Sequence, residues 1–155
     1  MIRKYSVVLF FLCSAFITTN VGAQVVVSKA GSPKCLLDIS AFKTSDGAAE
    51  TLFLRTLEED LKRSGWFIVT RQGKGNFAVQ GTCRQGGNSL NIRCQVDNVV
   101  NGAIAMNKSY DGGAAQACSL AHNAADDIVW AIKKVKGIAS TRIALVGNRG
   151  GKKNI

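Results

Sequence analysis

Two stretches of the chain place hydrophobic residues at helical spacing, and the first follows the loop at residues 43–48. Its apolar positions, which share one face of a helix, are Phe53, Leu54, Leu57 and Leu61. Ser45 or Asp46 is a suitable N-cap, and Gly65 is placed to end the helix. On the opposite face, the predicted i,i+4 ion pairs are Glu58 with Lys62 and Glu59 with Arg63. The pattern predicts an amphipathic helix with one buried face.

The second helical pattern is longer and runs from about residue 114 to residue 136. Its predicted buried positions are Ala117, Ala121, Ala124, Ile128, either Ala131 or Ile132, and Val135. Gly137 is placed to stop this helix. Three lysines lie in or beside its last turn, where the negative end of the helix dipole favours each cation by about 0.3–1 kcal/mol. These lysines therefore do not by themselves indicate an anionic ligand.

Runs of β-prone residues predict six strands, at residues 34–42, 66–71, 77–84, 90–96, 103–110 and 141–146. A turn at Asn88-Ser89 joins the third strand to the fourth, and Asn101-Gly102 joins the fourth to the fifth. The element order is β-α-β-β-β-β-α-β. It predicts a layered α/β (α+β) fold, in which two main helices pack on a mixed sheet of about five to six strands.

The first 23 residues have the features of a cleavable signal peptide. Arg3 and Lys4 precede an apolar run at residues 5–17 that is too short to span a membrane, and Val21-Gly22-Ala23 offers a cleavage site. An uncleaved anchor is the alternative. We expect export to the periplasm, followed by an arm at residues 24–34, a single domain at residues 35–147 and a basic, flexible tail at residues 148–155.

Four cysteines would remain after export, and an even number in an oxidising compartment favours disulfides. A turn at Asn88-Ser89 would place Cys83 directly opposite Cys94, so this pair is the predicted bridge. Cys35 with Cys118 is then the possible second pair. Buried thiols are the alternative. Zinc is disfavoured, because the sequence has neither a C-x-x-C motif nor a pair of histidines.

Residues suited to catalysis are few. The single histidine, His122, precedes Asp126 by one helical turn, and this couple either transfers protons or fixes local packing. We favour packing, because no serine or cysteine motif accompanies the couple. The glycine-rich segments lack the spacing of a phosphate loop. We therefore predict a protein that is not an enzyme and that needs no cofactor or metal.

The chain is basic, with a formal net charge of +10, and many of its cations lie toward the C-terminus. The cations considered are Lys133, Lys134, Lys136, Arg142, Arg149, Lys152 and Lys153. No recognition motif accompanies them and an exported protein seldom meets nucleic acid, so we expect no nucleic-acid partner. Contact with anionic envelope polymers or lipid headgroups is more plausible than contact with nucleic acid, but a solvent-exposed basic face that binds neither is favoured over both.

Three motifs together resemble the amino-terminal domain of TolB, the periplasmic component of the Tol-Pal envelope system. AHNAADDIVWAIKKVKGIASTRIALV, at residues 121–146, is similar in spacing to a family helix of the form A-H-x-x-A-D-x-I and a following T-R-I-A-x-V strand. DLKRSGWFIV, at residues 60–69, resembles the end of the family's first helix, and QVVVSKAG lies where the family has its partner-binding arm. The resemblance covers roughly residues 24–147.

The resemblance implies a non-enzymatic adaptor for outer-membrane integrity during cell division, which is also exploited in protein import. Its arm would bind a TolA-like inner-membrane partner or another Tol-Pal component through Gln24, Val25, Val26, Val27, Ser28 and Lys29. Those three valines could add to a partner's sheet edge or pair with the chain's own sheet. His122 and Asp126, with Gly137 after them, would have structural roles.

The sequence departs from the family in two places. A short Gly-rich link precedes residue 77 where the family has another helical segment, and TolB continues into a Pal-binding β-propeller whereas this sequence ends at Ile155. We therefore expect no propeller-borne activity. The alternative function is that of a stand-alone envelope accessory protein, which would bind anionic envelope polymers through its basic C-terminal region.

Overall fold

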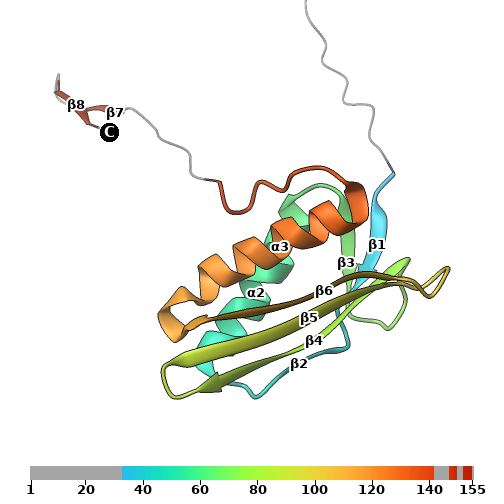
Figure 1. Ribbon diagram of the computed structural model, residues 1–155. Coiled ribbons are helices and arrows are strands. Elements are labelled where there is room, and N and C mark those ends of the chain that lie inside the picture. The colour runs from blue at the N-terminus through green and yellow to red at the C-terminus, as the bar shows by residue number, and fades with distance from the viewer. Residues whose placement is uncertain (1–32, 142–146, 150–151, 155) are drawn as a thin grey trace, which may run out of the picture. The chain divides into compact units, whose positions relative to one another are not determined.

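Two helices cover one face of a mixed β-sheet in the computed structural model, which describes residues 33–141, 147–149 and 152–154 (Figure 1). The sheet has six strands in the order β3-β1-β4-β5-β6, with β2 also paired to β4. The strands are β1 (Cys35–Asp38), β2 (Phe42–Thr44), β3 (Phe67–Thr70), β4 (Phe77–Gly86), β5 (Ser89–Asn98) and β6 (Ile104–Gly113). The helices are α2 (Ala48–Arg63) and α3 (Ala117–Lys133), and a 3-10 turn, η1 (Ala114–Gln116), precedes α3. The predicted fold class is confirmed.

Parallel and antiparallel pairing meet at β4. β1 pairs in parallel with β3 and with β4, and the crossover through α2, between β2 and β3, lets β3 run parallel to β1. β4, β5 and β6 form an antiparallel meander joined by short turns. The meander supplies three long strands. No described helix covers the face of these strands that points away from α2 and α3 (Figure 1).

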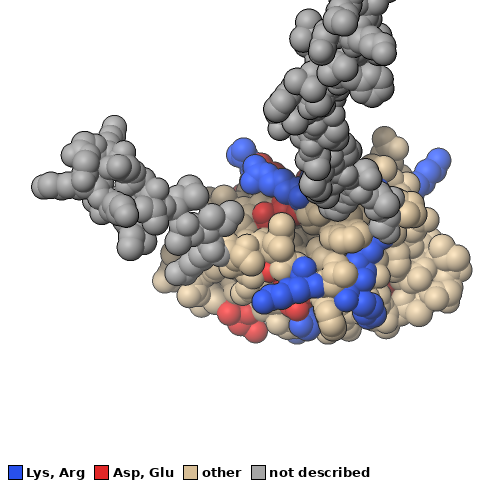
Figure 2. Space-filling model, turned by 90° about the horizontal axis from the view of Figure 1, so that it is seen from above, with Lys and Arg blue, Asp and Glu red and all other residues tan. Residues whose placement is uncertain are grey.

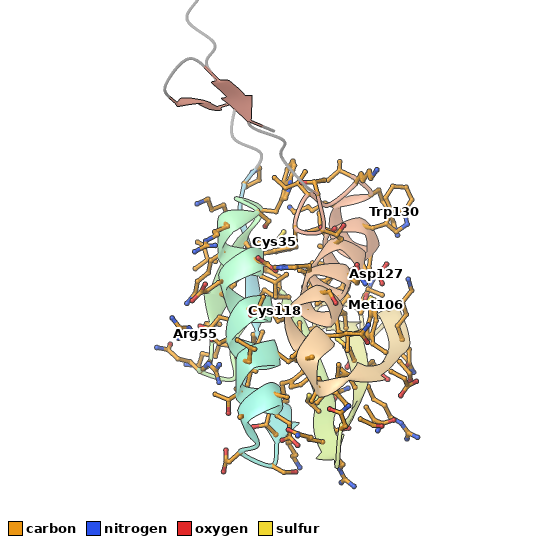
Figure 3. The ribbon with its side chains drawn as sticks, turned by 90° about the vertical axis from the view of Figure 1, so that its left-hand side faces the viewer. Cys35, Arg55, Met106, Cys118, Asp127 and Trp130 are labelled. Atoms are coloured by element: carbon orange, nitrogen blue, oxygen red, sulfur yellow. The ribbon has the colours of Figure 1, made fainter. Side chains whose placement is uncertain are left out.

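The core lies between the helices and the sheet, and the two helices lie side by side (Figure 3). Phe53, Leu57 and Leu61 of α2 are fully buried, as their helical spacing predicted. The buried face of α3 is built largely from alanines, namely Ala117, Ala121, Ala124 and Ala125. Small side chains let α3 approach its neighbours closely. The larger side chains in the helix layer of the core come from α2.

Local hydrogen bonds changed several predicted boundaries. The predicted strand at 34–42 is two strands, because the Asp38 carboxylate accepts the Ser40 hydroxyl at 2.7 Å and turns the chain after β1. Neither Ser45 nor Asp46 caps α2; Gly47 is the N-cap and makes no side-chain cap hydrogen bond. Helix α3 ends at Lys133, with Lys134 in the left-handed conformation, so the helix stops four residues before the predicted stop at Gly137.

The β4–β5 hairpin has a different register from the predicted one. Its turn is Gly87-Asn88, so Cys83 lies opposite Ile92 and Cys94 lies opposite Gly81. The predicted direct pairing of Cys83 with Cys94 is therefore wrong, although both side chains remain on the buried face. A shift of two residues preserves the alternation of faces while separating cross-strand partners.

The possible second disulfide is also contradicted, because Cys35, Cys83, Cys94 and Cys118 are all free thiols. Cys35 Sγ lies 3.0 Å from Lys133 Nζ, at the C-terminal end of α3, whereas Cys118 lies at the N-terminal end of this 17-residue helix. A rise of about 1.5 Å per residue separates these ends by more than about 20 Å. A bridge between Cys35 and Cys118 would therefore require α3 to move.

The C-terminal region is described only in part. Residues 142–146, which hold most of the predicted last strand, lie outside the described residues, as does the predicted signal peptide. Beginning one residue before the predicted tail, β7 (Gly147–Arg149) and β8 (Lys152–Asn154) form a two-stranded antiparallel sheet. Arg149 pairs with Lys152 in that small sheet, so part of the basic tail has a regular backbone.

Candidate interaction surface

The predicted partner-binding arm, Gln24, Val25, Val26, Val27, Ser28 and Lys29, lies outside the described residues. A candidate site among the described residues therefore lies on the domain rather than on the arm. The motif residues His122, Asp126 and Gly137 all lie within the described range, and their contacts show what the motif does.

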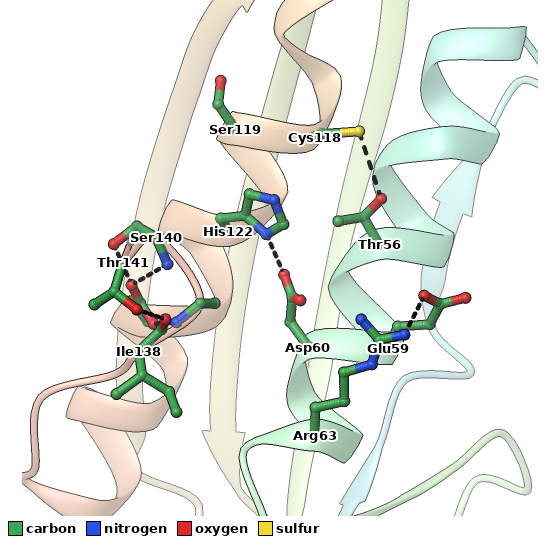
Figure 4. A network of polar contacts seen from close by, with 12 residues as sticks. Thr56, Glu59, Asp60, Arg63, Cys118, Ser119, His122, Ile138, Ser140 and Thr141 are labelled. Atoms are coloured by element: carbon green, nitrogen blue, oxygen red, sulfur yellow. Dashed lines mark hydrogen bonds and ion pairs between the residues drawn. The ribbon is translucent and has the colours of Figure 1, made fainter. Parts of the chain in front are cut away.

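His122 connects the two helices. Its Nδ1 atom lies 2.5 Å from Asp60 Oδ2 on α2, and the Asp60 side chain is only 10% exposed (Figure 4). The couple with Asp126, four residues later on the same helix, is not formed, so the predicted local contact is wrong. One turn earlier, Cys118 Sγ accepts a hydrogen bond from Thr56 Oγ1 at 3.8 Å. His122 therefore fixes packing, as favoured from the sequence, but across the helix interface.

Asp126 holds the segment that follows α3. Its carboxylate accepts the backbone N–H of Ala139 at 2.8 Å, the backbone N–H of Ser140 at 3.0 Å and the Ser140 hydroxyl at 2.5 Å. Gly137 is buried directly against it, and a Cβ atom at that position would lie 2.1 Å from Asp126 Oδ1. The aspartate and the glycine thus form one unit that folds the segment after the helix back onto α3.

The uncovered sheet face carries polar side chains whose positions follow from the strand register. Alternate residues of a strand point to opposite faces, and the partners of a cross-strand pair point to the same face. Lys43, Thr82 and Arg93 pair in sequence across β2, β4 and β5, and Arg84 lies two residues beyond Thr82. Since Cys83 and Ile92 face the helices, Lys43, Arg84 and Arg93 point away from them.

These three cations line an open hollow of about 1140 Å³, here termed the basic hollow. Its lining is Ala41, Lys43, Gln80, Gly81, Thr82, Arg84, Gln85, Gly86, Asn91, Arg93, Cys94, Gln95 and Asn107. This set contains three cations and no carboxylate. Within the described residues, neither Lys43, Arg84 nor Arg93 forms a salt bridge. The lining itself therefore carries a net positive charge, and two carboxylates, Asp97 and Asp111, the cross-strand partner of Asn91, lie on the same face beside it.

A row of amide side chains crosses the same face beside the cations. Gln80 Nε2 and Gln95 Nε2 both donate to Asp97, the second at 2.8 Å, and Asn107 Nδ2 donates to Gln95 Oε1 at 3.3 Å. Asp97 itself is outside the lining of the hollow. The shared carboxylate orders the amides, which can donate to and accept from a polar ligand.

The helical face has a different character. Lys and Arg are interspersed with Asp and Glu there, as seen from above in Figure 2. The predicted pairs Glu58–Lys62 and Glu59–Arg63 are present at 2.7 and 3.5 Å, and Arg71 adds a second cation to Glu58. Although partial burial acts to raise the pKa of Glu58, hydrogen bonds from Lys62 and Arg71 hold it below its ordinary value. Charge on this face is therefore largely neutralised locally.

Exposed apolar side chains gather at the turn between β5 and β6. Val99, Val100 and Ile104 are 56%, 81% and 60% exposed, respectively. Exposed apolar groups of this kind often belong to contact surfaces. Nothing in the described structure indicates what would cover them, whereas the basic hollow defines the charge and hydrogen-bonding chemistry of its ligand.

Two of the free thiols are strongly perturbed. Burial, reinforced by the charge of Glu50, raises the pKa of Cys83 from 9.0 to about 12. Burial and the charge of Asp127 raise the pKa of Cys94 to the same value. Burial and a hydrogen bond to Asp127 also raise the pKa of Tyr110. These groups stay protonated at neutral pH, so the two cysteines are core residues rather than nucleophiles.

This arrangement predicts a loss of stability at alkaline pH. Because the folded pKa of both thiols exceeds the unfolded value, their contribution is complete below about pH 9 and falls as the pH rises toward about 12. The free energy of unfolding should fall by up to about 1.4 kcal/mol per thiol for each pH unit in that interval. Urea titrations across it should show the slope, and Cys83→Ala/Cys94→Ala should reduce it to the part that Tyr110 contributes. An unchanged slope in that variant would contradict the assignment, with Cys35→Ala/Cys118→Ala as the matched control.

The described residues contain neither a metal-binding cluster nor a membrane-spanning helix. No group of three or more His, Cys, Asp or Glu side chains there could hold a metal ion. No helix in this part of the chain is both long and apolar enough to cross a membrane.

Fold and surface together define a small two-layer α/β domain with one open, basic sheet face. No protein-family model matches the chain. The Tol-Pal system protein TolB of Legionella pneumophila, in strains Corby and Paris, is 30% identical over 118 residues, which is 66% of this chain and 28% of TolB. The crystal structure of TolB from Acinetobacter baumannii superimposes with a TM-score of 0.61 at 19% identity, covering 73% of this chain and 32% of that one.

The predicted resemblance to the TolB amino-terminal domain is confirmed by these similarities in sequence and in fold. The chain spans 28% of the length of the curated relatives. The basic hollow was not predicted from the sequence, because its cations lie on three separate strands rather than in one basic run. Period-two alternation in residues 80–95 is the signal that could have found it, because Asn91, Arg93 and Gln95 stand between buried residues, and Gln80, Thr82 and Arg84 each adjoin one.

Proposed function

We propose that this chain is a non-enzymatic interaction module of the cell envelope, which works in the periplasm with components of a Tol-Pal system. The observation that supports the proposal is the 118-residue match to TolB, a Tol-Pal system protein, together with the shared fold. The proposal transfers two properties from TolB to this chain, namely the domain fold as a scaffold and the location in the cell envelope. It does not carry over functions of the remaining 72% of TolB, which the match does not reach.

The contacts of the motif residues support a scaffold role rather than a reactive one. His122 is bound to Asp60 between the helices, and Asp126 is saturated by donors from the segment after α3. Neither side chain is directed at a cleft in which a substrate could react. The motif that carried the resemblance therefore stabilises the domain on which a binding segment can be presented.

The binding segment that we propose is the arm at Gln24–Lys29. Three consecutive valines form a β-prone end, and an extended segment of this kind can add as a strand to the sheet edge of another protein. The partner would be a TolA-like inner-membrane protein or another Tol-Pal component. Backbone hydrogen bonds would supply affinity, and alternate side chains of the arm would supply specificity.

Deleting residues 24–29 from the mature protein tests this function. We expect binding to a purified TolA-like protein to weaken by at least about tenfold, because the strand-forming segment is lost. Isothermal titration would measure the affinity, and the thermal unfolding midpoint should not change. A length-matched variant in which Val25, Val26 and Val27 become serine should give the same loss. Unchanged affinity with an intact fold would reject the arm as the binding segment.

A further inference from the structure

We propose that the basic hollow binds an acidic polysaccharide, a linear chain of sugars that carries oxyanion groups such as carboxylates or sulfates. This site is separate from the arm, and it does not depend on arm-mediated binding. It is also separate from the C-terminal tail, to which the sequence alone had assigned anionic polymers. The proposal rests on the charge, the hydrogen-bonding groups and the size of the uncovered sheet face.

The charges of the hollow suit a ligand with repeated anionic groups. Lys43 and Arg93 occupy the same row of the sheet, separated by Thr82 on the strand between them. With strands about 4.8 Å apart, their backbones lie about 10 Å from each other. Arg84 is displaced along β4 by two residues. Cations spread in this way can each meet a different oxyanion of an extended chain, whereas a single small anion could reach only one or two.

The remaining side chains of the hollow suit a ligand rich in hydroxyl groups. Gln80, Gln95 and Asn107 form the ordered amide row, and Asn91 stands beside Arg84 on the neighbouring strand. Amides both donate and accept, as sugar hydroxyls do. No aromatic residue lines the hollow, so a ligand there would be held by charge and hydrogen bonds rather than by stacking on aromatic rings. Among polyanions, this composition favours a polysaccharide.

The size and openness of the hollow favour a polymer over a small molecule. Its volume of about 1140 Å³ exceeds the range of about 300–1,000 Å³ that is usual for small-ligand pockets. Its floor is a sheet surface with no described helix above it, so a chain could enter and leave at either end (Figure 1). The sheet would hold one segment of a longer molecule.

The test compares two double variants of the mature protein with equal loss of charge. Arg84→Gln/Arg93→Gln removes two cations of the hollow, and Arg55→Gln/Arg63→Gln removes two highly exposed cations of α2. Figure 3 shows Arg55 on the side of α2 that is remote from α3. The probes are oligomers of polygalacturonate, which carries carboxylates, and of dextran sulfate, with neutral dextran for comparison. Isothermal titration would measure each affinity.

We expect the hollow variant to bind at least one charged probe about tenfold more weakly than the parent does. The α2 variant should bind the same probe with an affinity within about twofold of the parent's. Neutral dextran should not bind. The charged probe that binds the parent more tightly identifies the oxyanion. Raising the salt from about 0.05 to 0.5 M should weaken binding by the parent. Asn91→Ala should weaken polysaccharide binding about threefold while leaving binding of polyglutamate unchanged.

Three results would overturn the proposal. Equal losses in the two double variants would mean that the hollow has no special role. A tenfold loss confined to Arg149→Gln/Lys152→Gln/Lys153→Gln would assign the polymer to the tail. Polyglutamate or oligo-dT binding as tightly as the polysaccharides at the same salt would show that the face recognises charge alone. Lys43→Gln, at an exposed position, keeps the test informative if the arginine variant unfolds.

Discussion

Replacing Gly137 by alanine should destabilise the domain by about 3 kcal/mol, through a steric clash that the surrounding structure cannot relieve. A Cβ atom there would lie 2.1 Å from Asp126 Oδ1 and 2.6 Å from Asp126 Cα. The carboxylate could rotate only by giving up its hydrogen bonds to Ala139 and Ser140, and the Cα belongs to the backbone of α3. The segment after α3 would have to detach from the helix.

Thermal and urea unfolding of Gly137→Ala would measure this loss, which corresponds to a decrease in the unfolding midpoint of about 10 °C for a domain of this size. Gly86→Ala is the matched control, because a Cβ atom at Gly86 meets no other atom within 4 Å. The control should stay within about 1 kcal/mol of the parent. If the two variants unfold alike, the Gly137–Asp126 contact has no structural importance.

The helices and the buried faces of the strands could be predicted because both depend on local periodicity. Phe53, Leu57 and Leu61 recur every three to four residues, and each of them is fully buried. Likewise, Cys83 and Cys94 lie on the buried face that the alternation of β4 and β5 indicated. These features depend on the local sequence alone, and the buried positions in the structure agree with the prediction.

The hairpin register could not be predicted from the same alternation, since a shift of two residues leaves every side chain on its original face. The turn decided it: Gly87 adopts φ +61°, and glycine at the first position of a two-residue turn is typical of the type II′ hairpin. Weighing Gly87-Asn88 against Asn88-Ser89 by that rule would have found the register. The incorrect cysteine pairing was a consequence of the incorrect turn.

The polar partners of the motif were unpredictable for a different reason. His122 had a carboxylate one turn away, at Asp126, and the sequence contained no sign that Asp60, from another helix, would replace it. His122 and Asp60 are 62 positions apart in sequence, and they meet only because of the way α2 packs against α3. The basic hollow likewise combines β2, β4, β5 and β6, so its charge becomes visible only once the strand order is known.

Replacing Glu50 by alanine should also have a large effect, of about 3 kcal/mol, because this carboxylate is 1% exposed and joins three parts of the fold. From the first turn of α2 it accepts the backbone N–H of Ser45 in the preceding loop and that of Gln85 in β4, the latter at 2.6 Å. Alanine would leave both donors without this acceptor and would open a small cavity. Chemical denaturation of Glu50→Ala would measure the loss.

The comparison of Glu50→Ala with Glu59→Ala separates these buried contacts from the change in charge. Both variants remove one carboxylate from α2, but Glu59 is 42% exposed and pairs only with surface arginines, so its loss should cost less than about 1 kcal/mol. Glu50→Gln should fall between the two, since it retains one acceptor oxygen and turns an amide donor toward an N–H group. Equal losses for Glu50→Ala and Glu59→Ala would show that Glu50 does not anchor the start of α2 to the sheet.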